Sequence, residues 1–387
     1  MTTPATPNEP AKRDVRFAFA SCQYPAGVLD LGPARASMQR LDTCASEMSL
    51  DALLLLGDQI YADATYGILD PTSLGDGYRT NYEAMHKSLD RLHGLVALRD
   101  HQRLYNSPDD HEIKDNWEPG QDRSNQDIRD QALSAFEQHR LSALPPGSPA
   151  SGYWGVVDLG GQHQVFMLDT RTMRDQRPWG PGSPPAAPHI IHNLQRSELE
   201  RWLLGLHQID VEKDTVMPKL LSSAVWLLPR HAGRLNAQGG TDHTPARSDS
   251  WDGYPDSMHW LLTLIAHNGI QGVVVLCGDG HLAGHTVAQL TCDHHEVALH
   301  VLHAPALYAP FPFANARPSD YATHERFSWI WASNSVVCHV HSDLRPIGNG
   351  FVRVDLAQEA GTWQLTATFD TDAAPKPNEV RWSIGSN

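Results

Sequence analysis

Positive charge is scarce in this chain, which has 30 lysines and arginines against 45 aspartates and glutamates among its 387 residues. The formal net charge of −15 argues against a general nucleic-acid-binding surface and against binding to anionic membranes, because both need a basic surface. Long hydrophobic runs are also missing, and none approaches the roughly 18 apolar residues of a membrane span. The five cysteines are widely spaced and include no C-x-x-C pair, which argues against a disulfide framework and a structural zinc finger.

An apolar signal core and a twin arginine are missing from the first residues. We expect residues 1–14 to form a flexible tail, followed by a single domain over 15–387 whose last third is mostly β. The sequence as written predicts a soluble, cytoplasmic protein, or a periplasmic or secreted one if an export signal was removed. Nothing in the pattern indicates an oligomeric state.

Apolar residues make up 41% of the chain, which is enough for a sizeable core. The continuous apolar runs over 52–56 and 273–276 predict strands that are buried on both faces of a sheet. Helical spacing predicts one helix over 79–95. A capping box at 197–200 predicts the start of another helix, and the run over 220–228 predicts a further buried strand.

Residues that bind metals follow three of the predicted strands. Cys22 ends the first strand, Asp58 and Tyr61 follow the second, and Asp279 and His281 follow the third. In open α/β sheets, ligands bind beyond the carboxyl ends of the strands. Each residue alone has an ordinary structural explanation, such as a turn, a buried thiol or core packing. Their joint occurrence favours a metal site.

The segment over 108–117 concentrates acidic residues. It contains four carboxylates, a histidine and an asparagine: Asp109, Asp110, His111, Glu112, Asp115 and Asn116. Like charges this close repel each other, and bound cations would remove that cost. Oxygen ligands suit Ca²⁺, Mg²⁺ or Mn²⁺, whereas thiolate, phenolate and imidazole suit a transition metal such as iron. The chain supplies both sets, which predicts a two-metal site with unlike metals.

Six motifs occur in this order: SCQYPAG, LLLLGDQIYAD, DDHEIKDNW, LDTRTMRD, SWDGYPDSMHWLL and VVLCGDGH. Together they resemble the PhoD-like alkaline phosphatases of the calcineurin-like metallophosphatase superfamily. The resemblance implies an α/β fold with four layers, an α/β/β/α sandwich of two mixed sheets flanked by helices. It also implies Fe³⁺ and Ca²⁺ as cofactors, with Mg²⁺, Mn²⁺ or Zn²⁺ as alternatives.

The resemblance also assigns roles to individual residues. It implies seven metal ligands, which are Cys22, Asp58, Tyr61, Asp110, Asn116, Asp279 and His281. Asp58 would bridge both metals, and His111 would be the catalytic histidine beside it. We further consider Arg171, Arg174 and Arg230 as contacts to the substrate phosphate, although ordinary ion pairs are the explanation we favour for each. The chain departs from the family pattern at Gly280, where we expect valine, and at 228–231, which replaces a glutamine-containing segment.

These residues predict hydrolysis of phosphate esters, of the alkaline phosphatase or phosphodiesterase type, by a metal-bound hydroxide at a dinuclear site. The partner would then be a small phosphorylated substrate. Two alternatives remain open from the sequence. One is a metal-dependent hydrolase that acts on a non-phosphate ester or amide, and the other is a non-catalytic binding module that metals stabilise.

Overall fold

The computed structural model describes most of the chain. The described residues are 15–24, 31–63, 77–120, 123–139, 147–148, 150–177, 188–232, 248–310, 316–346, 348–372 and 378–385. The tail that we expect over 1–14 lies outside them, so its flexibility stays a prediction.

The first of two large sheets has seven strands in the order β17-β16-β15-β1-β2-β3, with β12 beside β1. Its strands are β1 (Val15–Gln23), β2 (Ala52–Leu56), β3 (Leu104–Ser107), β12 (Ala306–Tyr308), β15 (Gly350–Glu359), β16 (Thr362–Thr371) and β17 (Asn378–Ser383). The strands β1, β2 and β3 run parallel to one another, whereas β15 is antiparallel to β1. The carboxyl ends of the three parallel strands therefore meet at one edge.

The second sheet has eight strands in the order β13-β14-β10-β11-β9-β8-β7-β6. Its strands are β6 (Gly155–Gly160), β7 (His163–Met167), β8 (Lys219–Ser223), β9 (Val273–Cys277), β10 (Ala283–Cys292), β11 (His295–His303), β13 (His324–Trp331) and β14 (Asn334–Arg345). The strands β7, β8, β9 and β11 are parallel, and the remaining pairs are antiparallel. A short hairpin of β4 (Gly147–Ser148) and β5 (Gly152–Tyr153) lies apart from both sheets.

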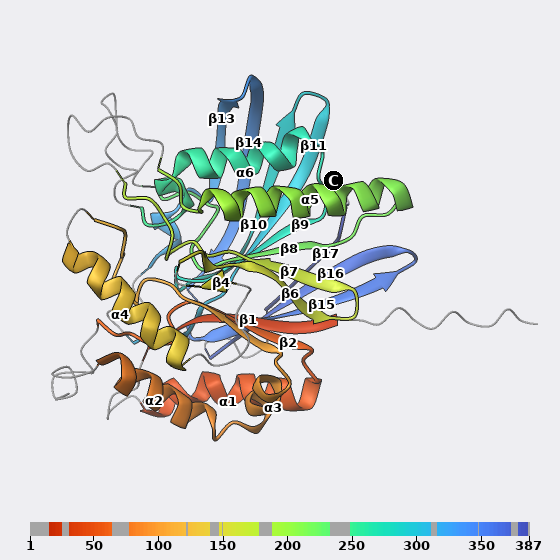
Figure 1. The fold of residues 1–387 in the computed structure, drawn as a ribbon. Coiled ribbons are helices and arrows are strands. Elements are labelled where there is room, and N and C mark those ends of the chain that lie inside the picture. Colours follow the sequence, from red (N-terminus) through yellow and green to blue (C-terminus); the bar gives the residue numbers. More distant parts are fainter. Residues whose placement is uncertain are drawn as a thin grey trace, which may run out of the picture.

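Helices cover the outer faces of both sheets (Figure 1). On the outer side of the first sheet lie α1 (Leu31–Met48), α2 (Gly77–Leu89) and α3 (His93–Asp100). On the outer side of the second sheet lie α5 (Asn193–Lys213) and α6 (Pro255–His267), while α4 (Arg123–His139) is at the side of the molecule. The layers are thus helix, sheet, sheet and helix, which confirms the predicted α/β/β/α sandwich.

The leucine run of β2 shows why this sequence needs four layers. Leu54 and Leu56 belong to the core between the two sheets, together with Val274 of β9. Leu53 and Leu55 point to the opposite face and pack with residues of α1 and α3. Since side chains alternate along a strand, a run without polar residues requires a cover on each face. The second sheet provides one cover, and the helices provide the other.

The helix predicted over 79–95 is two helices, α2 and α3, so that prediction is wrong. A tertiary contact divides them, because the carboxylate of Asp42 in α1 accepts hydrogen bonds from the backbone N–H groups of Gly94 (2.7 Å) and Leu95 (3.1 Å). This arrangement caps the start of α3. A side chain on Gly94 would collide with Ser46, since a Cβ there would lie 2.4 Å from its Oγ.

Two further boundaries differ from the prediction. Helix α5 begins at Asn193, so the capping box at 197–200 lies inside it, and the side chain of His192 accepts the backbone N–H of Leu194 instead. Strand β8 ends at Ser223, although the apolar run continues to residue 228. Beyond Ser223 the chain leaves the sheet but stays buried, where the carbonyl of Ala224 accepts the backbone N–H of Gly278 at 3.1 Å.

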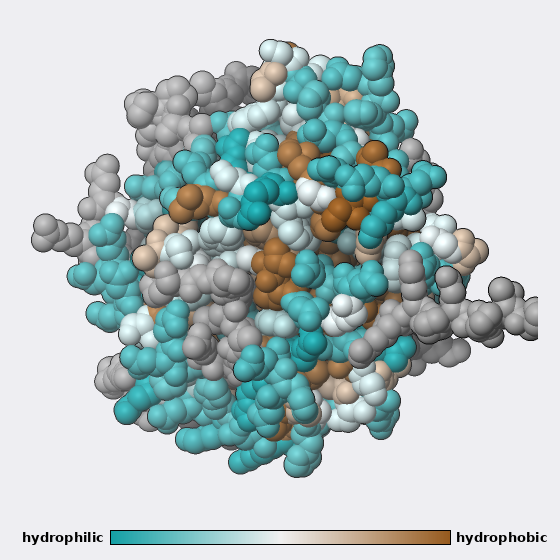
Figure 2. All heavy atoms as spheres, turned by 45° about the vertical axis from the view of Figure 1, so that its right-hand side comes forward, coloured by the Kyte–Doolittle hydropathy of each residue, from teal (hydrophilic) through white to brown (hydrophobic). Residues whose placement is uncertain are grey.

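Few large apolar side chains reach the surface of the described chain. Those that do are Leu31, Leu194, Ile209, Val211 and Ile330. The face in Figure 2 is mostly hydrophilic, with small separated hydrophobic areas. No helix within the described ranges is long and apolar enough to cross a membrane.

The core between the sheets can be tested at Leu54, which is 0% exposed. Leu54→Ala should lower the free energy of unfolding by about 2–5 kcal/mol, because it leaves a cavity between two closely packed sheets. The matched control is Leu194→Ala, since Leu194 is 60% exposed and its truncation should change stability by less than about 0.5 kcal/mol. Urea unfolding of both variants measures the difference, and equal losses would contradict this assignment of the core.

Candidate metal centre

The carboxyl ends of parallel strands from both sheets deliver the acidic residues to one place. Asp58 follows β2, Asp109 and Asp110 follow β3, and Asp279 follows β9. One carboxylate oxygen from each of these four aspartates lies within 4.8 Å of the others. A nitrogen of His111 forms a second such group with Asp58 and Asp110. The two groups share Asp58 and Asp110, so the five residues form one cluster.

Cys22 and Tyr61 line the same centre. The Cys22 Sγ lies 3.3 Å from Oδ2 of Asp58, and its thiol is also 3.9 Å from the carbonyl oxygen of Asp279. The ring of Tyr61 lies against the imidazole of His111, with 4.1 Å between the ring centroids. Burial raises the pKa of the Cys22 thiol well above its usual range, and Asp58 and Asp279 raise it further.

Five of the seven predicted ligands have left-handed backbone conformations. Their φ angles are 58° for Cys22, 57° for Asp58, 52° for Asn116, 64° for Asp279 and 53° for His281. Residues other than glycine seldom adopt this region, and such strain concentrates at functional sites. Three of the five, Cys22, Asp58 and Asp279, lie together in the centre, whereas Asn116 is exposed.

Glu112 holds the loops of the centre in place through their backbone. Its carboxylate accepts hydrogen bonds from the N–H groups of Asp58 (2.9 Å), Gln59 (2.7 Å) and Asp109 (2.7 Å). Burial raises the pKa of Glu112 to about 7, against the opposing effect of the N–H groups of Asp109 and Asp58. From the sequence, Glu112 is only one more carboxylate of the acidic segment. Its position three residues after Asp109 was the sole sequence signal for a backbone-capping role.

Asp63 positions His111. Its Oδ1 lies 2.8 Å from Nδ1 of His111, and its Oδ2 accepts the backbone N–H of Asp115 at 2.5 Å. Burial disfavours a charged imidazole, but Asp110 and the hydrogen bond with Asp63 raise the pKa of His111 to about 11. Asp63 closes the LLLLGDQIYAD motif, but the sequence predicts no role for it. The hydrogen bond at Nδ1 directs the opposite nitrogen, Nε2, away from Asp63.

Several acidic groups of the centre cannot all be ionised without positive charge nearby. Burial raises the pKa of Asp58 well above its usual range, and Asp110 adds to this shift. Burial likewise raises the pKa of Asp279, with further contributions from Asp109 and Asp110. For Asp109, burial raises the pKa to about 6, although Arg171 opposes the shift. Cations bound among these side chains would favour their charged forms.

Unpaired oxygens show where such cations fit. Oδ2 of Asp109 and Oδ1 of Asp110 are buried and have no hydrogen-bond partner among the described residues, and the same holds for the Tyr61 hydroxyl. Buried polar atoms are nearly always paired, so unpaired ones that face a shared space indicate a missing ligand. Carboxylates, a thiol and a phenol are suitable donors for metal ions. The residues present therefore fit a metal centre.

Arg171 brings a positive charge next to the aspartates of the centre. It is fully buried, and its Nε donates to Oδ1 of Asp109 at 2.7 Å. Its two terminal nitrogens donate to the carboxylate of Asp249 at 3.0 Å and 2.5 Å. Arg174 binds the same carboxylate at 2.5 Å. Burial would raise the pKa of Asp249, but the two arginines hold it well below its usual range.

The three arginines considered as substrate contacts are all engaged in ion pairs. Arg171 and Arg174 share Asp249, which follows a residue range that the structure does not describe and which the sequence analysis did not single out. Arg230 forms a two-point ion pair with Glu325, and its guanidinium lies 3.9 Å from the centroid of the Phe327 ring. Their contact with a substrate stays a prediction.

The remaining predicted ligands lie at the rim. Asn116 is exposed, its backbone N–H donates to Oδ2 of Asp110 at 2.7 Å, and its side chain donates to Asp115 at 3.1 Å. His281 follows Asp279 by two residues and is partly buried. Their roles as ligands stay predictions.

The glycine at position 280 has a structural explanation. A Cβ on Gly280 would lie 2.4 Å from Cε2 of Trp226. The indole is buried and packs on His303 and Tyr321, with ring centroids 4.1 Å and 4.4 Å away. Trp226 thus occupies the space that a larger residue at 280 would need. The loop from Asp279 to His281 lies directly against this aromatic group.

Comparisons with known proteins agree on one family. The sequence model of the PhoD-like phosphatase family matches residues 17–324. Alkaline phosphatase D of Bacillus subtilis (strain 168) is 27% identical over 295 residues, which are 68% of this chain and 45% of that protein. The chain thus spans less than half the length of that relative.

The solved structure of PhoD is similar over 100% of this chain and 74% of its own, with a TM-score of 0.59 and 18% identity. That likeness supports the fold, and the family match covers most of the chain from β1 to the start of β13. The chain belongs to the PhoD-like phosphatase family.

Proposed function

We propose that this protein hydrolyses phosphate esters at a dinuclear metal centre formed by the end of β1 and by the loops that follow β2, β3 and β9. The observation that carries the proposal is the convergence of Asp58, Asp109, Asp110 and Asp279 within 4.8 Å, with His111 beside them. Family membership supports phosphate esters over other esters and amides as substrates. The natural substrate would be a small phosphorylated molecule.

We propose that Fe³⁺ and Ca²⁺ are the cations, held by Cys22, Asp58, Tyr61, Asp110, Asn116, Asp279 and His281. The thiol of Cys22 and the phenol of Tyr61 lie in one cluster of buried residues and suit iron, whereas the oxygen ligands suit calcium. When bound, two cations would make a water molecule acidic enough to attack phosphorus near neutral pH, and they would offset the negative charge of the transition state.

The side chains of the centre would have different roles in the reaction. Asp58 would anchor both cations, because its carboxylate lies 3.3 Å from Sγ of Cys22 and also among the other three aspartates. His111 would donate a proton or a hydrogen bond to the leaving oxygen, held for this by Asp63. Arg171 would balance the charge of Asp109 and Asp110 from behind, since its N–H groups are directed at carboxylates and at a backbone carbonyl.

The proposed activity can be tested with p-nitrophenyl phosphate, bis-p-nitrophenyl phosphate and a p-nitrophenyl carboxylic ester. We expect the full chain to hydrolyse at least one of the two phosphate esters, and to act far less on the carboxylic ester. Asp58→Asn should abolish this turnover and the metal content while leaving the circular dichroism spectrum unchanged. Asp158→Asn, at an exposed position away from the centre, is the matched control. Faster turnover of the carboxylic ester would contradict the proposal, as would more than about a tenth of wild-type activity in Asp58→Asn.

A second prediction concerns the pair of His111 and Asp63. His111→Ala should lower turnover by about 10² to 10⁴ with metal content nearly unchanged, because it removes an acid or hydrogen-bond donor. Asp63→Asn should lower turnover less, since the imidazole remains but loses its orientation. The double variant should be no slower than His111→Ala alone, because Asp63 acts through His111. Fully additive losses, or loss of a metal in His111→Ala, would show that these roles are wrong.

A third prediction concerns the identity of the cations. Phenolate and thiolate ligands transfer charge to Fe³⁺ in the visible range, so the iron-loaded protein should be coloured. Tyr61→Phe and Cys22→Ser should each shift or bleach the band and lower iron occupancy. Tyr82→Phe is the control, because Tyr82 is a buried tyrosine outside the proposed ligand set. A colourless, iron-free and fully active protein would refute the mixed-metal assignment.

A further inference from the structure

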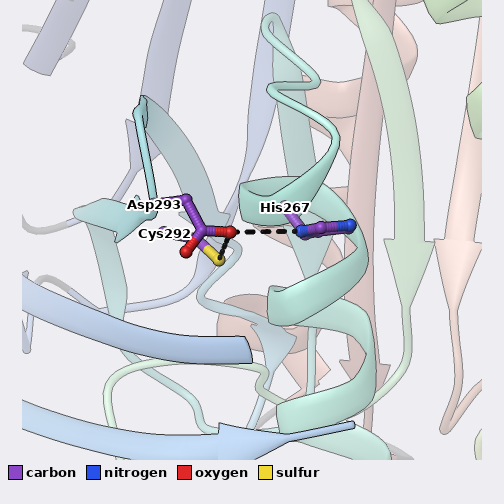
Figure 3. A group of neighbouring side chains, drawn as sticks. All are labelled: His267, Cys292 and Asp293. Carbon is purple, nitrogen blue, oxygen red and sulfur yellow. Dashed lines mark hydrogen bonds and ion pairs between the residues drawn. The ribbon is translucent and has the colours of Figure 1, made fainter. Parts of the chain in front are cut away.

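A second group of potential metal ligands lies where α6 meets the hairpin of β10 and β11. It consists of His267 at the end of α6, Cys292 at the end of β10, and Asp293 in the turn that follows. One ligand atom from each residue lies within 4.8 Å of the other two. Figure 3 shows the carboxylate of Asp293 between the sulfur of Cys292 and the imidazole of His267.

The distances approach those between the ligands of a tetrahedral cation. Oδ2 of Asp293 lies 3.7 Å from Nδ1 of His267 and 3.8 Å from Sγ of Cys292. Zinc bonds of about 2.0–2.3 Å to nitrogen, oxygen and sulfur place neighbouring ligand atoms a little over 3 Å apart. Two of the three pairs are thus within a few tenths of an ångström of that spacing, and the ligand atoms of His267 and Cys292 lie within 4.8 Å of each other.

The backbone around the group is already fixed. Asp293 has a left-handed φ of 52°, which directs its side chain back toward Cys292 in the tight turn. The imidazole Nδ1 of His295 lies 2.8 Å from the carbonyl oxygen of His267, so the hairpin and the end of α6 are already joined. Gly269, at φ 65°, allows the close approach, since a Cβ there would lie 3.2 Å from the His295 ring. These contacts hold the three donors in position before any cation binds.

The type of donor selects the type of cation. One thiol, one imidazole and one carboxylate form a mixed set that suits zinc or a similar transition metal. Calcium and magnesium require more oxygen ligands than this group offers. His267 and Asp293 are exposed whereas Cys292 is buried, so water can complete the coordination from one side only. Three protein ligands with one open position is a coordination known for zinc.

We propose that His267, Cys292 and Asp293 bind one zinc-type cation at a site separate from the catalytic centre. Strand β10 separates the two, because it begins at Ala283, two residues after His281, and ends at Cys292. Its length corresponds to about 30 Å. Binding replaces the thiol proton of Cys292, which is released to solvent, by the metal. The cation joins the end of α6 to the β10–β11 hairpin and stabilises that end of the second sheet.

The experiment measures zinc binding to the 387-residue chain that carries the substitution Asp58→Asn. This substitution removes the proposed anchor of the dinuclear centre. Calorimetric titration with Zn²⁺ should find one equivalent. Adding His267→Ala or Asp293→Asn should weaken its affinity at least about tenfold, since even partners outside the coordination sphere contribute that much. Both residues are exposed, so neither change should impair folding. His101→Ala, at the end of α3, is the matched control and should leave binding unchanged.

A Co²⁺ titration of the same chain identifies the sulfur. The bound Co²⁺ should show a thiolate band in the near ultraviolet that Cys292→Ala removes and that Cys22→Ser and Cys338→Ala retain. Cys338 is the matched control, because it is a buried cysteine of the neighbouring strand β14. Absence of a zinc equivalent, unchanged affinity in His267→Ala, or a cobalt band that depends on Cys22 instead of Cys292 would each overturn the proposal.

Discussion

The concentration of negative charge at one end of two sheets is the constraint on which the rest of the structure depends. Asp58, Asp109, Asp110 and Asp279 are brought within 4.8 Å of one another, in a place where burial opposes ionisation. The buried Arg171 offsets part of this cost through its ion pair with Asp109. Arg171 also forms an ion pair with Asp249. Oδ2 of Asp109 and Oδ1 of Asp110 still have no hydrogen-bond partner among the described residues, so the chain compensates this acidic group only in part. Bound cations complete the compensation in the function that we propose.

Precise placement of this charge requires a rigid support. The four-layer sandwich gives that support, since the strands that carry the ligands are covered on both faces. Glu112 then fixes the loops after β2 and β3 through their backbone N–H groups, and Asp63 fixes His111. Trp226 lies against Gly280 and limits the loop after β9 in the same way. The side chains to which we assign catalytic or metal-binding roles are thus held in place by Glu112, Asp63 and Trp226.

Local patterns in the sequence determined much of the fold and of the position of the site. The apolar run of β2 predicted a doubly covered strand, because alternation leaves no polar face. The placement of Cys22, Asp58 and Asp279 at strand ends predicted that they would meet, since parallel strands bring their carboxyl ends to one edge. The ordered motifs identified the family. Each of these inferences depends on residues that are close in sequence or on a general rule of sheets.

The tertiary structure alone decided the features that depend on partners distant in the chain. Asp42 divides the predicted helix over 79–95 into two, and it lies in another helix. Arg171 takes its partner Asp249 from 78 residues away, so its spacing gave no sign of the ion pair. The group of His267, Cys292 and Asp293 likewise forms only where α6 meets the β10–β11 hairpin. Composition and periodicity reflect interactions within a segment, such as the burial of one face of a strand. A buried charge or a metal ligand instead finds its partner in whichever segment the fold places beside it, and that segment can be far away in the sequence.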